Sequence, residues 1–109
     1  PAVAICDISA MVYDRLATGR PLMVTRPVEP EAEVDEEGYL GVCEWLRAEE
    51  AQDIAAVLDR VIGDAAARER LGTWSERYFG DTSPGAPTAR FHAAIETLLA
   101  RADEWRARR

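Results

Sequence analysis

Hydrophobic residues at the start of the chain fall into two short runs, with a helix-forming stretch between them. Residues 3–6 and 22–25 are both too brief for a helix and are bounded by polar turns, which is typical of buried strands. Residues 10–17 read as two helical turns, with Ser9 as the N-cap and Gly19 and Pro21 ending the helix. This order predicts a βαβ unit whose two strands run parallel.

From residue 48 onward the hydrophobic positions recur at helical spacing. The pattern predicts helices over residues 48–62, 65–79 and 88–107, with Gly63 ending the first and Asp64 capping the second. Residues 38–43 are predicted to form a short third strand or an extended edge, and residues 44–46 stay ambiguous. The apolar stripes consist of Ala51, Ile54, Leu58, Val61 and Ile62 in the first helix, of Ala67, Leu71, Trp74 and Tyr78 in the second, and of Phe91, Ile95, Leu98, Ala102 and Trp105 in the third.

These elements place the chain in the α/β class, as a partial Rossmann-like unit of two to three parallel strands with about four helices. At 109 residues the chain has room for one small domain, so residues 1–109 form a single fragment. Parallel strands are buried on both faces, and so few of them leave open strand edges. We therefore expect the last part of a larger doubly wound domain. Alone, the fragment should form a homodimer or cover the open edge in another way.

Composition narrows the functional classes. The net charge of −7 argues against a nucleic-acid binder that neutralises phosphates. All 13 basic residues are arginine, which excludes a lysine Schiff base or a Walker-type lysine within the chain. Cys6 and Cys43 lack metal-ligand spacing and favour a reduced, cytoplasmic setting. No apolar run reaches the length needed to span a membrane.

Residues 26–37 combine two prolines with six carboxylates. Clustered like charges with proline favour a solvated, mobile loop over a divalent-metal site, because nothing fixes the geometry that a metal needs. We predict neither a metal nor a cofactor. His92, the single histidine, borders the apolar stripe of the last helix and is interpreted as structural, and Trp74 and Tyr78 are interpreted as core rather than as a base-stacking platform.

The end of the first predicted strand carries the strongest chemical signal. Asp7 and Ser9 follow it directly, and ligands of open α/β sheets bind at the carboxyl ends of the strands. The first amides of a helix are unpaired, and the helix dipole makes that end positive, so it attracts phosphate. We interpret Asp7 as orienting the turn through an Asx-type hydrogen bond. For Ser9, phosphate contact and simple capping are compatible interpretations.

The motif D-x-S-x-x-x-x-D at residues 7–14, followed by Gly19-Arg20-Pro21, resembles the C-terminal domain of the CDP-glycerol glycerophosphotransferase family. Those enzymes build teichoic-acid-type cell-wall polymers and have a GT-B architecture. Ala10 stands where family members usually carry a second serine, and Glu37 stands where a basic residue is frequent. The resemblance continues weakly through residues 38–39 and 79–90.

The resemblance implies a transferase that moves glycerol phosphate from CDP-glycerol, or another nucleotide-linked donor, to a polymer acceptor. It implies a cytoplasmic location with peripheral contact of the full-length protein at the inner face of the membrane. The general base would lie outside this chain, so its catalytic residues are unknown and the fragment alone should be inactive. The implied substrate-binding residues are Ser9, Ala10 and Asp14, together with Ser83, Gly85 and Arg90 in the later segment.

Two of these residues also have an interpretation that involves no substrate. Asp14 is equally well read as a solvated carboxylate on the helix, and Arg90 as an exposed arginine or the member of an ion pair. Two other functions also stay open. One is a GT-B glycosyltransferase that uses a nucleotide sugar. The other is a degenerate, non-catalytic assembly domain, which Ala10 and Glu37 favour.

Overall fold

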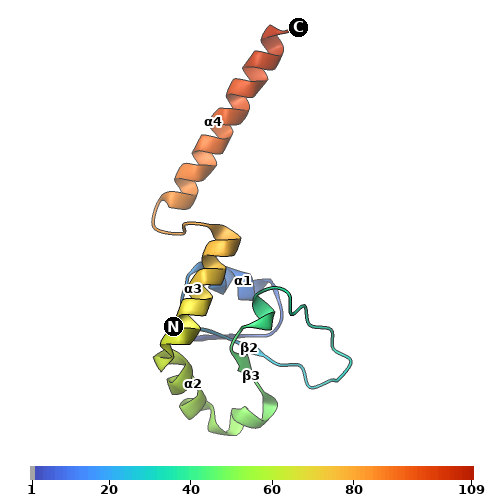
Figure 1. The fold of residues 1–109 in the computed structure, drawn as a ribbon, viewed down its shortest axis with the longest axis vertical. Helices are drawn as coiled ribbons and strands as arrows, with labels where there is room; N and C mark the ends of the chain where they lie inside the picture. Colours follow the sequence, from blue (N-terminus) through green and yellow to red (C-terminus); the bar gives the residue numbers. More distant parts are fainter. Residues whose placement is uncertain (1) are drawn as a thin grey trace.

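The computed structural model describes residues 2–109, which form a small α/β body and one long helix that projects from it (Figure 1). The body contains the strands β1 (Ala4–Cys6), β2 (Leu22–Thr25) and β3 (Trp45–Leu46), the helices α1 (Ala10–Ala17), α2 (Ile54–Gly63) and α3 (Ala65–Phe79), and the 3-10 helices η1 (Tyr39–Gly41) and η2 (Ala48–Asp53). The projecting helix is α4 (Ala86–Ala107). The predicted α/β class and the helix count are confirmed.

The three strands form one parallel sheet in the order β1-β2-β3. Ala4 lies opposite Leu22, and Thr25 lies opposite Leu46. The predicted parallel pairing of the first two strands is therefore confirmed. Because the strands run the same way, their carboxyl ends meet at one edge of the sheet, which holds the starts of α1 and η2.

Each face of the sheet has its own hydrophobic cluster. On one face, α1 and α3 pack against the strands, with Val12, Leu16 and Leu71 among the buried side chains. On the other face, Val57 and Val61 of α2 cover Met23 of the central strand. Burial of these side chains is the main stabilising contribution, at about 25 cal/mol per Å² of apolar surface.

The third strand lies later than predicted. Residues 38–43 contain the 3-10 turn η1 instead of a strand, and β3 is the segment Trp45–Leu46 that the pattern left ambiguous. Tyr39 and Leu40 are adjacent in sequence and both buried in the same cluster, whereas neighbouring residues of a strand point to opposite faces of the sheet. A turn points both side chains into the same cluster.

The helix predicted over residues 48–62 is two elements. Its first part, Ala48–Asp53, is the 3-10 helix η2, which has no buried residue, and the α-helix begins at Ile54. The predicted stripe is correct at Val61, which is buried, and at Ile54, Leu58 and Ile62, which are half-buried. Ala51 is exposed, and the buried Val57 was not part of the prediction. The only apolar side chains before Ile54 in this segment are the small ones of Ala48 and Ala51, so these residues have little apolar surface to bury.

The two C-terminal helices have nearly the predicted bounds. Asp64 caps α3 as predicted, since its carboxylate accepts a hydrogen bond from the Ala67 amide at 3.1 Å. Trp74 is half-buried as expected, whereas Tyr78 is 43% exposed and only borders the core. Helix α4 starts at Ala86 rather than Thr88, because Gly85 adopts φ +84° directly before it.

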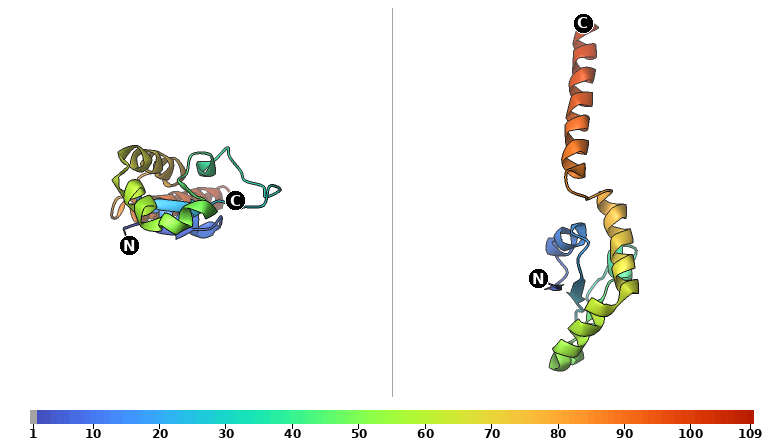
Figure 2. Two further views of the ribbon diagram at one scale, coloured as in Figure 1. Left: turned by 90° about the horizontal axis from the view of Figure 1, so that it is seen from below. Right: turned by 90° about the vertical axis from the view of Figure 1, so that its left-hand side faces the viewer.

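Helix α4 extends away from the body, and the right-hand view of Figure 2 shows no other segment beside it. Only Ala86 and Ala102 of this helix are half-buried, and every other α4 residue is exposed. The predicted stripe therefore packs against nothing within residues 2–109. His92 is exposed as well, so it takes no part in a core.

Candidate functional site

The tip of α1 lies at the carboxyl edge of the sheet and is open to solvent. Asp7, Ile8, Ser9 and Ala10 are all exposed. Ser9 has an extended backbone (φ −158°, ψ 175°), and its hydroxyl makes no capping hydrogen bond. The hydroxyl and the first amides of α1 therefore face water together and are available to an anionic group.

Two acidic residues, Asp7 and Asp14, lie near this tip. The Asp7 side chain makes no hydrogen bond with residues 2–109, so the predicted Asx-type turn does not form. Asp14 is exposed and lies four residues after Ala10, which puts it one turn along the same side of α1. Ser9 and Ala10 thus lie at the tip of α1 and Asp14 lies one turn further on, and a role of these three residues toward a substrate stays a prediction.

Two arginines complete the carboxyl edge of the sheet. Thr25 is paired with Leu46, so the next residues, Arg26 and Arg47, follow the ends of neighbouring parallel strands. The Arg26 amide still donates to the Leu46 carbonyl at 2.8 Å, which holds the two chains together at this point. Both arginines line the same cavity of about 220 Å³. A second cavity of about 220 Å³ adjoins it through the same two residues.

The charges around this pair are mixed. Arg26 forms an ion pair with Glu36 at 3.6 Å and stacks on the Trp45 ring at 4.5 Å, which fixes its direction. Arg47 is exposed, and its guanidinium forms no ion pair with residues 2–109. Glu49 lies in the lining of the first cavity. Two cations at adjacent strand ends repel each other, and a phosphate group between them would offset that repulsion.

Ser83, Gly85 and Arg90 lie elsewhere. Ser83 lines a cavity of about 320 Å³ together with Gly19, which follows the C-terminal end of α1, whereas Ser9 precedes its N-terminal end. An eight-residue helix is about 12 Å long, so the two groups of predicted residues are not brought together.

Local hydrogen bonds tie this second group to the loop between α3 and α4. Arg90 donates to the carbonyls of Phe79 at 2.9 Å and Asp81 at 2.6 Å. The Ser83 amide donates to the Asp81 carboxylate at 2.9 Å. Hydrogen bonds from Ser83, with a smaller contribution from the charge of Arg90, hold the pKa of Asp81 below its ordinary value. The structure thus gives Arg90 a structural use, and its role toward substrate stays a prediction.

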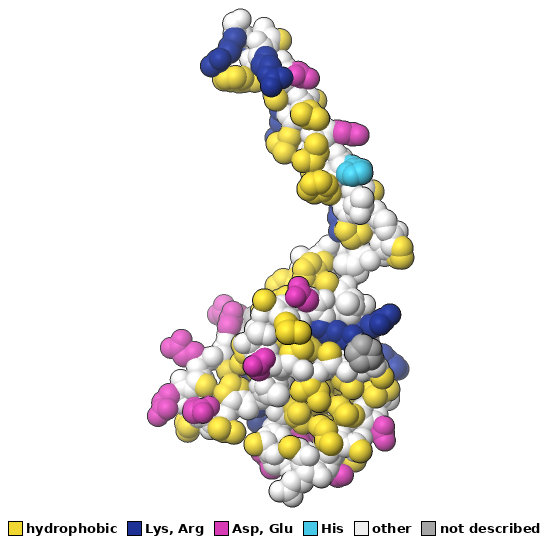
Figure 3. Space-filling model, turned by 180° about the vertical axis from the view of Figure 1, so that it is seen from behind, with side chains coloured by type: hydrophobic (Ala, Val, Ile, Leu, Met, Phe, Trp, Pro, Cys, Tyr) yellow, Lys and Arg dark blue, Asp and Glu magenta, His cyan; other side chains and the backbone are white. Residues whose placement is uncertain are grey.

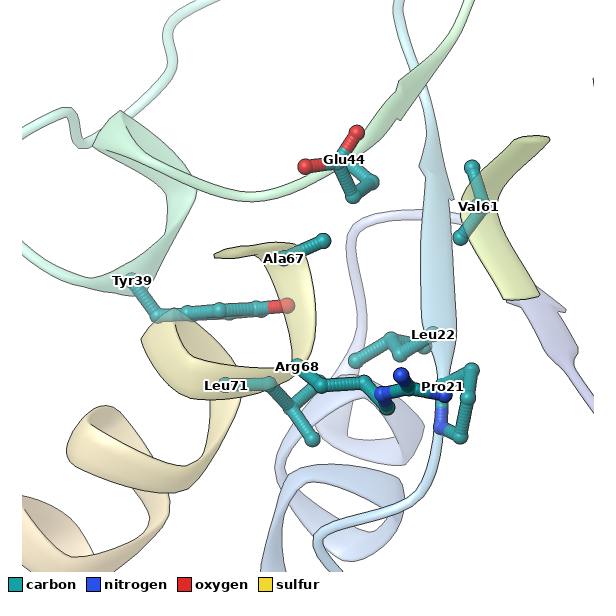
Figure 4. Close-up of a pocket in the computed structure, with 8 residues that line it drawn as sticks. All are labelled: Pro21, Leu22, Tyr39, Glu44, Val61, Ala67, Arg68 and Leu71. Carbon is teal, nitrogen blue, oxygen red and sulfur yellow. The ribbon is translucent and has the colours of Figure 1, made fainter. Parts of the chain in front are cut away.

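A more enclosed cavity lies between β2 and α3 (Figure 4). It measures only about 10 Å³, enough for about one water molecule. Burial raises the pKa of the Tyr39 hydroxyl at its border, and Cys43 and Glu44 raise it further. Burial, assisted by Glu44, also raises the pKa of the Cys43 thiol to about 12, which leaves this cysteine unreactive at neutral pH. This region belongs to the core.

The acidic loop does not form a metal site within the described residues. Among residues 2–109, no group of three or more His, Cys, Asp or Glu side chains is arranged to hold a metal ion. The Asp35 carboxylate instead accepts a hydrogen bond from the Glu37 amide at 3.1 Å.

Sequence reasoning missed Arg26 and Arg47. The available signal was an arginine directly after an apolar run, in Leu-Met-Val-Thr-Arg and again in Trp-Leu-Arg. This signal is weak because Arg26 also begins the acidic loop and because residues 38–43 compete with residues 45–46 for the third strand. With the strand at residues 45–46, both arginines fall at strand ends.

Comparison with known proteins assigns this chain to no family. The chain matches no protein-family model, and no curated protein or solved structure is similar enough to count as a match. Within residues 2–109, none of the helices has the length and apolar character needed to cross a bilayer.

Proposed function

We propose that this chain supplies the donor-phosphate site of a transferase that moves glycerol phosphate from CDP-glycerol to a growing teichoic-acid-type polymer. The family resemblance of residues 7–14 and 19–21 suggests the donor. The observation that carries the proposal is the carboxyl edge of the parallel sheet. There, the uncapped Ser9 tip of α1 and the pair Arg26 and Arg47 offer amides and guanidinium groups to an anion.

The proposed chemistry is in-line attack of a polymer hydroxyl on the phosphorus bonded to glycerol, with CMP leaving. The phosphorus–oxygen bond to CMP breaks as the bond to the acceptor forms, and the acceptor proton passes to a general base. Guanidinium groups and helix amides stabilise the charge on the phosphate oxygens, and the fold positions the donor. The general base is assigned outside this chain, so the 109 residues alone should bind donor without turning it over.

Binding of CDP-glycerol, followed by the fluorescence of Trp45, tests the proposal. Arg26 stacks on this ring, so a ligand that contacts Arg26 should change Trp45 emission in a saturable way. Each charge-assisted hydrogen bond contributes about 1.5–3 kcal/mol, so the Arg26→Ala and Arg47→Ala variants should each lose about tenfold or more in affinity.

A matched control is Arg77→Ala. Arg77 also stacks on a tryptophan, Trp74, at 4.8 Å, but it lies on α3 away from the carboxyl edge. Its removal should leave donor affinity unchanged. Absence of saturable binding, or an equal loss in all three variants, would refute the site. Tighter binding of a UDP-sugar than of CDP-glycerol would indicate the nucleotide-sugar glycosyltransferase instead.

A second candidate is a non-catalytic assembly domain. The specific observation in its favour is α4, whose apolar side chains are exposed along the whole helix. Failure of the chain to bind any nucleotide, combined with self-association, would favour this function over the transferase.

A further inference from the structure

Helix α4 carries a stripe of large apolar side chains that are exposed to solvent. Figure 3 shows hydrophobic side chains spaced along α4 as well as grouped on the body. Phe91 is 64% exposed, Leu98 60%, Leu99 61% and Trp105 58%. An isolated helix gains little stability in water, and most helices are stabilised by packing of an apolar face. A helix of 22 residues with this face therefore requires a partner.

The stripe has the spacing of a coiled-coil seam. Phe91, Leu98 and Trp105 are seven residues apart, and so are Thr88, Ile95 and Ala102. The two sets alternate at intervals of three and four residues, which assigns the first set to d positions and the second to a positions. The seam covers almost all of α4, from Thr88 to Trp105.

We propose that α4 is the docking surface for α4 of a second copy of this chain, with the two helices antiparallel. In the register that places Ile95 opposite the partner's Leu98, Phe91 faces the partner's Ala102 and Trp105 faces the partner's Thr88. The two aromatic side chains then each meet a small one and Ile95 meets Leu98, which fills the seam evenly. The two bodies lie at opposite ends of the paired helices, so they do not collide. This inference does not depend on the proposed transferase function.

Charge at the positions flanking the seam favours the antiparallel direction. These positions carry Arg101, Arg106 and Arg108. In a parallel pair, Arg101 would face the partner's Arg106, and symmetry would repeat this repulsion. In the antiparallel register, Arg101 faces the partner's Ala94, so no like charges are opposed. A parallel pair would also set Ala102 against Ala102 of the partner and leave a gap.

The available area fits a weak dimer. With about 200 Å² for a whole side chain of this size, the exposed parts of the five large residues amount to roughly 550 Å² per copy, or about 1,100 Å² for the pair. The five residues are Phe91, Ile95, Leu98, Leu99 and Trp105. Specific interfaces start at about 1,000–1,200 Å², so this area lies at the low end for a stable pair and we expect weak pairing that depends on concentration.

Sedimentation equilibrium of the 109-residue chain between about 1 and 500 μM tests whether the pair forms. The wild-type chain should shift from monomer to dimer over this range. Leu98→Glu puts a charge into the centre of the seam and should weaken the dimer by about 100-fold or more. Thr97→Glu, one position away on the outer side of α4, is the matched control and should leave the dimer intact. A chain that stays monomeric at every concentration would overturn the proposal, and so would equal effects of both substitutions.

Two substitutions at Ala94 test the direction of pairing. Ala94→Glu places a carboxylate opposite the partner's Arg101, and symmetry repeats this contact. The substitution should therefore tighten the dimer about three- to fivefold. Ala94→Arg should weaken the dimer by a similar factor. The same substitutions at Thr97 should have no such opposite effects. In a parallel pair, position 94 faces the uncharged Leu99 of the partner, so equal effects of Glu and Arg would overturn the antiparallel arrangement. Binding of monomers to vesicles of anionic lipid, without dimers, would identify a membrane as the occupant and also overturn it.

Discussion

The guanidinium of Arg26 lies 4.5 Å from the centre of the Trp45 ring. This contact joins the residue that follows β2 to the first residue of β3, and so it closes the carboxyl edge of the sheet. Arg26 also reaches Glu36 at 3.6 Å, which ties the acidic loop to the same edge. One side chain therefore connects two strand ends and the loop between them.

Arg26→Ala should lower the free energy of unfolding by about 0.5–1.5 kcal/mol. The variant loses a partly buried cation–π contact and a solvent-exposed ion pair, which contribute modest amounts. Urea unfolding followed by circular dichroism measures the loss, and tryptophan emission should report a more exposed Trp45. Addition of 1 M NaCl should reduce the difference between wild type and variant only slightly, because salt screens the ion pair but not the stacking. A difference that disappears in salt would contradict the stacking role.

Tyr78 illustrates a second long-range tie. Its hydroxyl accepts a hydrogen bond from the Tyr39 amide at 3.4 Å, and its ring makes an edge contact with Tyr13, with centroids 5.6 Å apart. Tyr78→Phe should lower stability by about 0.5–1.5 kcal/mol, because the Tyr39 amide loses its acceptor while the ring contact stays. Denaturant titration checks this value. Tyr13→Phe is the control and should change stability by less, since the Tyr13 hydroxyl makes no hydrogen bond with residues 2–109.

The local elements of the fold could be predicted because their signals are local. Short apolar runs gave β1 and β2, and Asp64 marked the start of α3 by its capping ability. The position of β3 could not be predicted in the same way. Trp45 and Leu46 form only a two-residue strand, and their pairing with β2 is a tertiary contact that no local pattern encodes.

The residues of the candidate site likewise fall into those with a local sequence signal and those that depend on tertiary pairing. Ser9 and Ala10 follow from the predicted βαβ unit, which puts both at the start of α1, whereas Asp14 joins them through the family resemblance. The proximity of Arg26 and Arg47 depends on the register of β2 and β3, and it became visible only with the pairing of Thr25 and Leu46. The separation of Ser83 from Ser9 likewise depends on how α3 crosses α1, which helical spacing alone does not determine.

Stability should decline in alkali because of the Cys43 thiol. Its pKa in the folded chain is about 12, above the ordinary value near 9, mainly because of burial. Between these values the unfolded chain releases the thiol proton while the folded chain keeps it, so rising pH favours unfolding. The full contribution is present below pH 9 and is lost as the pH approaches 12. The raised pKa of Tyr39 acts in the same direction at higher pH.

Urea midpoints at pH 7, 9, 10 and 11 measure this dependence. The midpoint should be nearly constant from pH 7 to 9 and then fall. Cys43→Ala removes the titrating group and should flatten the decline, although its midpoint at pH 7 is lower because a core side chain is smaller. Tyr39→Phe should flatten the upper part of the curve. Parallel curves for wild type and both variants would show that other groups control the alkaline transition.

Gly41 and Gly72 should respond in opposite ways to replacement by alanine. A Cβ atom at Gly41 would overlap the carbonyl oxygen of Glu36, which is backbone and cannot rotate away. Gly41→Ala should therefore displace the acidic loop and η1 and lower the free energy of unfolding by about 1–3 kcal/mol. Gly72 lies inside α3 with nothing within 4 Å of the new atom, so Gly72→Ala should raise stability by about 0.5–1 kcal/mol through its better helix propensity. Thermal and urea unfolding compare the two variants, and a neutral result at Gly41 would mean that the Glu36 carbonyl does not approach this turn in solution.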